Sequence, residues 1–170
     1  MRRMKGERIM SKTDLFKEVM GNYPTGVTVV TMMDEEGTPI GLTVNSFASV
    51  SLDPMLLLWS IDKRVSSYEK FTQTKKFAVH VLAHDQAEVC SLFASKGLDR
   101  FKNTDWSESA NGLPIIADCA GVFQCEMHDT IEAGDHSILV GKVVDIESNK
   151  KEPLLYHKRK FAGIPDSFYE

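Results

Sequence analysis

The sequence predicts a mainly β fold class: a small barrel closed from antiparallel strands, with a few short helices between them. Three observations support it. Six or more extended runs are separated by turn residues, and the regular β-α-β alternation of a doubly wound sheet is missing. The length of 170 residues suits one domain, and 42% hydrophobic and 26% charged residues are typical of folded globular proteins.

The chain begins with basic residues and a predicted helix. Residues 1–11 contain Arg and Lys but no apolar stretch of signal-peptide length, which predicts a mobile basic leader in a cytoplasmic protein. An amphipathic helix follows, with Thr13 as its cap and Gly21-Asn22 as its end. Its apolar stripe consists of Leu15, Phe16, Val19 and Met20.

The next two elements are a predicted hairpin and a buried strand. Residues 26–33 are β-branched and uninterrupted, residues 34–39 supply turn residues, and residues 40–47 resume an extended pattern. Residues 55–61 are apolar, lack a polar face and are too short for a typical helix. We therefore expect a central strand that is buried on both faces.

Helices and strands then alternate less regularly. The pattern predicts a short helix over residues 65–72 and a strand over residues 76–82 with Phe77, Val79 and Val81 on one face. A second amphipathic helix begins at Asp85, with Glu88 at capping-box spacing, and ends near residues 96–97.

The last third combines an irregular region with two strands. Residues 98–120 show little periodicity, which in a compact domain is typical of a functional segment. Residues 121–131 and 137–147 are separated by a glycine-containing loop and predict an antiparallel hairpin. We expect the domain to span residues 12–164 and residues 165–170 to form a C-terminal tail.

Composition narrows the function classes. With 20 Lys and Arg against 24 Asp and Glu, the chain lacks the basic surplus that attracts nucleic acid or an anionic membrane, so neither is an expected partner. No apolar run approaches the roughly 20 residues of a membrane helix. The three cysteines have no CxxC pair, which argues against a zinc site or a disulfide framework and favours reduced, mostly buried thiols.

One polar segment offers hydroxyl and amide side chains at the end of a predicted strand. These are Thr43, Asn45, Ser46, Ser49 and Ser51. Together with free backbone N–H groups, such side chains can bind a phosphate without an arginine fork. The alternative interpretation is a solvent-facing strand and turn, which composition alone favours.

Two further segments carry candidate site residues, and the first of them is a candidate anion site. Residues 60–67 combine Lys63 and Arg64 with Ser66 and Ser67 at a helix start, although a solvated turn with capping serines explains them equally well. Residues 98–101 place a cation and an aromatic ring in the irregular region, where a surface charge beside a core anchor is the simpler interpretation.

The last candidate is Gly134-Asp135-His136 in the predicted hairpin loop. His136 can orient a ligand or carry a proton, because the ordinary histidine pKa of about 6.5 allows both states. The alternative is a turn with a polar tip. No nucleophile elbow, metal-ligand pair, dinucleotide fingerprint or P-loop is present, which favours a barrel whose chemistry belongs to a bound cofactor.

Taken together, these motifs resemble the flavin reductase family of short-chain FMN- or FAD-binding proteins, the reductase components of two-component monooxygenases. The resemblance covers about residues 16–161. It rests on five segments in a characteristic order: Pro24-Thr25-Gly26-Val27, the run from Thr43 to Pro54, Ser66-Ser67, Asp99-Arg100-Phe101 and Gly134-Asp135-His136.

The resemblance implies a fold and an assembly. It implies a Greek-key split β-barrel of the FMN-binding type that forms a homodimer, with the flavin near the subunit interface. NADH or NADPH would donate hydride to FMN or FAD, and the reduced flavin would go to a monooxygenase partner. No metal is expected.

The resemblance also implies roles for particular residues. Flavin ribityl and phosphate groups would contact Thr43, Asn45 and Ser46, and the isoalloxazine ring would contact Ala48, Ser49 and Ser51. The phosphate end would be closed by Val65, Ser66 and Ser67. Arg100 and Phe101 would approach the flavin from the irregular region, and His136 would orient the nicotinamide as the catalytic residue.

Two other functions remain open on the sequence alone. A related barrel can bind flavin without a nicotinamide site and act as a non-catalytic binding module. A pyridoxamine-phosphate-oxidase-like enzyme is the third reading, but its phosphate site would be expected to carry more Arg and Lys than this polar segment has.

Overall fold

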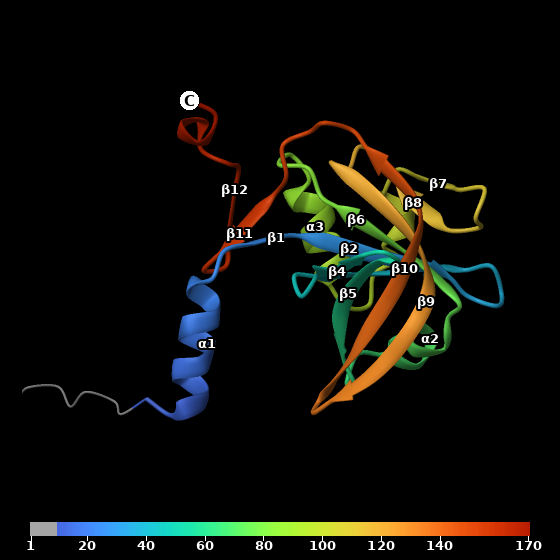
Figure 1. The fold of residues 1–170 in the computed structure, drawn as a ribbon, viewed down its shortest axis with the longest axis horizontal. Helices are drawn as coiled ribbons and strands as arrows, with labels where there is room; N and C mark the ends of the chain where they lie inside the picture. The colour runs from blue at the N-terminus through green and yellow to red at the C-terminus, as the bar shows by residue number, and fades with distance from the viewer. Residues whose placement is uncertain (1–9) are drawn as a thin grey trace, which may run out of the picture.

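The computed structural model describes residues 10–170 and confirms the mainly β class (Figure 1). The elements follow in this order: α1 (Lys12–Asn22), β1 (Thr25–Gly26), β2 (Thr28–Met33), β3 (Pro39–Val44), β4 (Ala48–Leu52), β5 (Met55–Asp62), α2 (Tyr68–Gln73), β6 (Lys76–Val81), α3 (Ala87–Ala94), η1 (Phe101–Asn103), β7 (Trp106–Glu108), β8 (Pro114–Ile116), β9 (Gly121–Ala133), β10 (His136–Ser148), β11 (Leu155–His157), β12 (Lys160–Ala162) and η2 (Asp166–Phe168). The predicted leader falls almost wholly on residues 1–9, which lie outside the described residues.

A seven-stranded antiparallel sheet forms the body of the protein. Its order is β3-β2-β6-β9-β10-β5-β4, so β3 and β4 are its two edges. Within residues 10–170, backbone pairing does not join these edges. Both predicted hairpins are confirmed, β2–β3 and β9–β10. The β9–β10 loop is only two residues long, and Gly134 adopts a left-handed φ of 65° there, a conformation that glycine reaches without strain.

The body has one core inside the curved sheet and a second beneath α3. In the first, the Trp59 ring meets the rings of Phe71 and Phe77 edge-on, with centroid distances of 5.3 and 5.9 Å. In the second, Phe101 makes edge-on contacts with Phe93 and Trp106. Aromatic pairs in this geometry add to the stabilisation from burial.

The expectation that residues 55–61 form the strand buried on both faces is wrong. This strand is β5, which lies next to edge strand β4 and fully buries only alternate side chains, those of Leu57, Trp59 and Ile61. The strand buried on both faces is β6, near the centre of the sheet, where residues 77–80 are completely inaccessible. Position in the sheet, which hydrophobicity alone does not reveal, decides between the two.

Helix α1 forms as predicted, but its cap is Ser11 and not Thr13. Ser11 and Asp14 make a complete capping box, in which each side chain bonds the other residue's backbone N–H. The apolar stripe of α1 packs against nothing in residues 10–170, and Phe16 and Val19 are 67% and 68% exposed. The helix projects from the body (Figure 1).

The region from residue 85 to residue 120 is more regular than predicted. Helix α3 runs over residues 87–94, and the capping box expected between Asp85 and Glu88 does not form. The N-cap residue is Gln86, whose side-chain amide accepts a hydrogen bond from the backbone N–H of Ala83 and donates one to the carbonyl of Ala117. The following segment contains η1 and the small hairpin β7–β8. All three cysteines are free and buried, as predicted.

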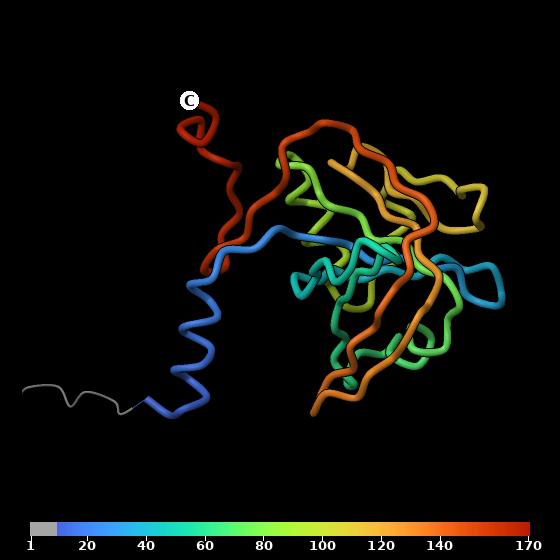
Figure 2. Tube along the Cα trace, viewed as in Figure 1, coloured from blue at the N-terminus to red at the C-terminus, as the bar shows by residue number. Residues whose placement is uncertain are grey.

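The chain after β10 forms a second sheet that the sequence analysis missed. Strands β11 and β12 pair with each other, and β11 also pairs with β1. Figure 2 shows how this pairing brings the N-terminal and C-terminal segments together at one side of the body. We call α1 together with this three-stranded sheet the arm.

Candidate functional site

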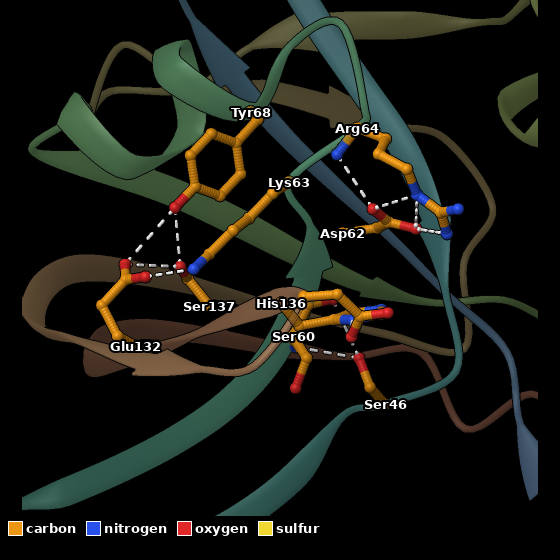
Figure 3. A network of polar contacts seen from close by, with 10 residues as sticks. Ser46, Ser60, Asp62, Lys63, Arg64, Tyr68, Glu132, His136 and Ser137 are labelled. Atoms are coloured by element: carbon orange, nitrogen blue, oxygen red, sulfur yellow. Dashed lines mark hydrogen bonds and ion pairs between the residues drawn. The ribbon is translucent and has the colours of Figure 1, made fainter.

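Ser46 links the loop after β3 to strand β5. Its hydroxyl accepts a hydrogen bond from the backbone N–H of Ser60 at 2.9 Å and donates one to the carbonyl of Ser60 at 3.2 Å (Figure 3). The Ser46 hydroxyl thus acts as both donor and acceptor to the backbone of Ser60. This bridge continues the pairing of β4 with β5, in which Ala48 is opposite Leu58, and it holds the polar segment at residues 45–51 against the end of β5.

His136 lies beside the end of β5, as the first residue of β10 opposite Asp62. Its Nδ1 is 2.7 Å from a carboxylate oxygen of Asp135, and this bond lowers the pKa of the Asp135 carboxyl. Arg64 donates from Nε and Nη2 to Asp62, which holds the pKa of the Asp62 carboxyl well below its usual range. The imidazole is partly exposed.

A second network, which the sequence analysis did not anticipate, lies at the same end of the sheet. Glu132 forms an ion pair with Lys63 and accepts from the Ser137 hydroxyl at 2.9 Å, and Ser137 also bonds the Tyr68 hydroxyl at 2.7 Å (Figure 3). Lys63, predicted as a free cation for an anion site, is thus neutralised within the protein. Pairing of Glu132 with Ser137 across a hairpin could be guessed only once the strand register was known.

The three residues that precede α2 divide into two kinds. Val65 is half-buried against the first core. Ser66 is exposed, and Ser67 is the N-cap of α2 but makes no side-chain capping bond. Within the described residues, both serine hydroxyls are therefore available to a ligand.

The polar segment itself lies along an edge of the sheet. Ala48 and Ser49 are exposed on β4, and Ser51 is half-buried. Asn45 is exposed, and its side-chain amide makes no hydrogen bond within residues 10–170. Thr43, by contrast, donates its hydroxyl to the carbonyl of Cys90 at 2.8 Å and so joins β3 to α3.

Arg100 and Phe101 are set apart from the cluster around Ser46 and His136. The Arg100 guanidinium donates to the carbonyls of Gly41 and Ser95, and partial burial lowers its pKa. Phe101 is 8% exposed in the second core. Gly41 is required beneath these rings, because an added Cβ would lie 2.6 Å from the Phe93 ring.

Two pockets adjoin these elements. The larger, about 640 Å³, lies by the β2–β3 turn and the end of α2 and contains no predicted site residue. The smaller, about 290 Å³, lies between β3, α3 and the arm, and its lining includes Thr43, Asn45, Cys90, Tyr156 and Phe161. We call the smaller one the arm pocket.

Among residues 10–170, no group of three or more His, Cys, Asp and Glu side chains is arranged to hold a metal ion. In the same part of the chain, no helix combines the length and apolar character needed to cross a membrane. Burial raises the pKa of the Cys119 and Cys125 thiols to about 12, which keeps both protonated and unreactive.

The structure is a mainly β domain whose sheet edge carries hydroxyl, amide and imidazole groups. Residues 20–165 match the family model described as flavin reductase like domain. The chain belongs to this family.

Relatives of known name agree with that assignment. The chain is 44% identical over 150 residues to the stachydrine N-demethylase reductase subunit Stc3 of Rhizobium meliloti, covering 85% of this chain and 65% of that protein. It is 43% identical to the FMN reductase (NADH) SmoA of Agrobacterium fabrum, covering 86% and 83%. It spans 65%, 45% and 48% of the length of three of the most similar curated relatives.

Solved structures show the same fold. The NADH:FAD oxidoreductase SgcE6 of Streptomyces globisporus superposes with a TM-score of 0.86 at 33% identity, covering 94% of this chain and 98% of that chain. Nitrilotriacetate monooxygenase component B from Mycobacterium thermoresistibile also gives 0.86, at 34% identity, with coverages of 91% and 88%.

Proposed function

We propose that this protein is an NAD(P)H:flavin oxidoreductase that transfers hydride from NADH or NADPH to FMN or FAD and supplies reduced flavin to a partner monooxygenase. The observation that carries the proposal is the polar edge at residues 43–51, 60–67 and 136 in a chain of the flavin reductase like family. Relatives support it, among them the reductase component of a flavin-dependent trigonelline monooxygenase, 42% identical.

The residues at this edge fit a flavin. The Asn45 amide and the hydroxyls of Ser66 and Ser67 have hydrogen-bonding capacity that the described protein does not use, and these groups match ribityl hydroxyls and a phosphate. When bound, the flavin supplies the ability to accept hydride from nicotinamide and to pass electrons onward. Backbone and side chains of Ala48, Ser49 and Ser51 are our proposed contacts for its ring.

Four other predicted residues act by position in this proposal. Ser46 has both hydroxyl capacities engaged by Ser60, so it holds the polar segment in place. Arg100 and Phe101 fix β3 against α3, which orients Thr43 and the start of that segment. Val65 anchors the turn before α2 to the core.

His136 orients the nicotinamide. When Nδ1 donates to the Asp135 carboxylate, the ring can present Nε2 to a ligand. That atom can accept a hydrogen bond from the carboxamide N–H of a nicotinamide and hold the ring for transfer. Hydride transfer needs no proton from the histidine, so positioning supplies the acceleration.

We also propose the split β-barrel and its assembly. In this proposal, residues 12–164 form one barrel domain around the core that contains Trp59, and residues 165–170 form a tail. The uncovered stripe of α1 packs on a second copy in a homodimer, because a soluble monomer rarely exposes such a face. The protein acts in the cytoplasm, where its three thiols stay reduced.

One experiment tests the activity. Purified protein is mixed with FMN or FAD and with NADH or NADPH, and absorbance near 340 nm is followed. We expect flavin-dependent loss of absorbance with at least one pair. Tight flavin binding without turnover on any pair would instead identify a non-catalytic flavin-binding module.

A further inference from the structure

Four side chains from separate segments meet at the tip of the β9–β10 hairpin, next to His136. They come from the residue after β5, the start of α2, the end of β9 and the start of β10, and are in that order Lys63, Tyr68, Glu132 and Ser137. We call these four residues the tip network. In Figure 3 their side chains point toward one another, whereas the His136 ring points away from them. The proposed function gives His136 a role but gives none to the tip network.

Ser137 is the centre of the tip network. It is completely buried, and its hydroxyl lies 2.9 Å from a carboxylate oxygen of Glu132 and 2.7 Å from the Tyr68 hydroxyl. Lys63, and to a smaller extent Ser137, hold the pKa of the Glu132 carboxyl below its ordinary value, so this group is ionised and only accepts. Ser137 therefore donates its one proton to Glu132, and Tyr68 donates to Ser137. The direction of both hydrogen bonds is thus fixed.

The tip network holds the short turn that carries His136. The backbone N–H of Lys63 donates to the carbonyl of Asp135 at 3.0 Å, and the Asp135 carboxylate is 2.7 Å from Nδ1 of His136. Successive residues of a strand face opposite sides, so the buried side chain of Ser137 directs His136 to the other face. The backbone is therefore held on both sides of His136, at Asp135 and at Ser137.

Tyr68 connects this turn to the serines proposed for the flavin phosphate. It is the first residue of α2 and directly follows Ser67. Its ring packs against the first core, so its hydroxyl is carried on a fixed support. The hydrogen bond from Tyr68 to Ser137 thus sets the position of His136 relative to Ser67. Hydride transfer needs the two reacting rings in contact and aligned, which depends on such relative positions.

Stability alone does not account for the tip network. The side chains of Lys63 and Glu132 are 37% and 67% exposed, and ion pairs at such exposure contribute little to the free energy of unfolding. What the pair does provide is a fixed acceptor for the Ser137 hydroxyl. The consequence is a defined geometry at the start of β10, where His136 lies.

We propose that the tip network is a positioning device for hydride transfer, in which Tyr68, Ser137 and Glu132 hold His136 in the orientation that binds the nicotinamide. These three residues act through His136 and do not contact the nicotinamide themselves. The proposal rests on the proposed function, because that function gives His136 its role.

Tyr68→Phe is the most selective variant, because it removes one hydroxyl and leaves the ring in the core. Its matched control is Tyr169→Phe, which removes a tyrosine hydroxyl that donates to the carboxylate of Glu152 in the C-terminal segment. Both changes keep the size of the ring, so both proteins should fold, which circular dichroism checks.

A second pair of variants alters the acceptor of the Ser137 hydroxyl at an exposed position. Glu132→Ala removes the acceptor, whereas Glu132→Gln keeps an oxygen that can accept from Ser137 but loses the charge. We expect Glu132→Ala to behave like Tyr68→Phe and Glu132→Gln to stay within about twofold of the unaltered protein. Equal losses in Glu132→Ala and Glu132→Gln would assign the effect to charge and overturn the hydrogen-bond chain.

The first measurement is kcat/KM for the nicotinamide, together with the Kd of FMN. Tyr68→Phe should lower kcat/KM about fivefold, the effect of one lost hydrogen bond, while the Kd of FMN stays within about twofold. Tyr169→Phe should change neither value. In a protein that already carries His136→Ala, Tyr68→Phe should have no further effect on kcat/KM, because a residue that acts through His136 has nothing left to position. A general structural defect would lower kcat/KM in both backgrounds, and that result would overturn the proposal.

The second measurement does not depend on turnover. The ring signal of His136 in a proton–carbon NMR spectrum is identified by its loss in His136→Ala, and it is compared among the variants without ligand. It should move in Tyr68→Phe and stay in place in Tyr169→Phe, and an unmoved signal in Tyr68→Phe would overturn the proposal. If the unaltered protein reduces no flavin, the proposed function fails, and the NMR comparison still decides whether the tip network positions His136.

Discussion

His80 gives the most quantitative prediction that the structure supports. It lies on β6, completely buried between β2 and the β7–β8 hairpin. Its Nδ1 donates to the carbonyl of Val29 at 3.0 Å, and its Nε2 accepts from the N–H of Ile116 at 3.1 Å. Because one nitrogen must donate and the other accept, the folded protein holds the neutral ring in one tautomer.

Burial lowers the pKa of His80 from 6.5 to about 4. The unfolded chain therefore binds a proton on His80 at a pH where the folded protein does not. Stability from this residue is full above pH 6.5, falls as pH drops through the window from 6.5 to 4, and falls no further below it. At 1.36 kcal/mol for each pKa unit, the loss across that window is about 3 kcal/mol.

The perturbation is His80→Gln, whose amide can donate and accept but does not titrate. The free energy of unfolding is measured by urea titration at pH 7.0, 6.0, 5.0 and 4.5 and one protein concentration, with the fluorescence of buried Trp59 as signal. The unaltered protein should lose stability steeply over this range. The variant should start about 1–3 kcal/mol lower at pH 7 but lose less on acidification.

The comparison isolates His80 from other groups. Asp62 and Glu132 have carboxyl pKa values below their ordinary ones, so their stabilisation is lost only at still lower pH. His128→Gln, at an exposed histidine, is the matched control and should leave the pH profile unchanged. Parallel profiles for the unaltered protein and His80→Gln would refute the interpretation of His80 as a buried neutral base.

Three further predictions concern the site and its support. Asn45→Ala should weaken FMN binding by about 1–3 kcal/mol in a fluorescence titration, with little change in Tm. Ser46→Ala should weaken FMN binding and also lower Tm, because its hydrogen bonds to Ser60 are lost. Unchanged FMN affinity in both variants would remove this segment from the site. His136→Ala should raise the KM for the nicotinamide or slow hydride transfer in stopped flow, without changing flavin affinity. If the rate of the unaltered protein instead follows a single ionisation with pH, and this pH dependence is lost in the variant, His136 transfers a proton. Gly41→Ala should destabilise the protein by about 1–3 kcal/mol on urea titration, and an unchanged midpoint would show that the Phe93 ring can move aside.

Assembly has its own test. If α1 packs on a second copy, a charge on its stripe should dissociate the dimer, and Phe16→Glu should sediment as a monomer where the unaltered protein sediments as a dimer. Lys17→Glu, on the same helix but outside the apolar stripe, is the control. A monomeric unaltered protein that reduces flavin at full rate would exclude a shared site.

Local patterns predicted elements well where local physics decides them. Uninterrupted β-branched residues gave β2, and the spacing of two strands around Gly134 predicted the β9–β10 hairpin. The order of strands was not readable, because it depends on pairing between segments far apart in the chain. For this reason the strand buried on both faces was assigned to β5 when it is β6.

The candidate site divides in the same way. The hydroxyl and amide cluster at residues 43–51 was visible in the sequence as chemistry, and so was His136. What each residue contacts was not. Lys63 is paired with Glu132 of the β9–β10 hairpin, and the Arg100 guanidinium donates hydrogen bonds to the backbone carbonyls of Ser95 and Gly41. The sequence indicated Lys63 and Arg64 as two cations for an anionic ligand, but in the folded protein each pairs with a carboxylate of the protein, Lys63 with Glu132 and Arg64 with Asp62.

The arm shows why the last part of a site is the hardest to predict. Tyr156 and Phe161 lie in strands of three residues each, too short for alternation to stand out from a loop. They gain meaning only because β11 pairs with β1, which turns both rings toward Thr43 and Asn45 about 110 residues earlier in the chain. A pocket wall built by such a pairing leaves no local pattern in the sequence, so it emerges from the fold and not from a motif.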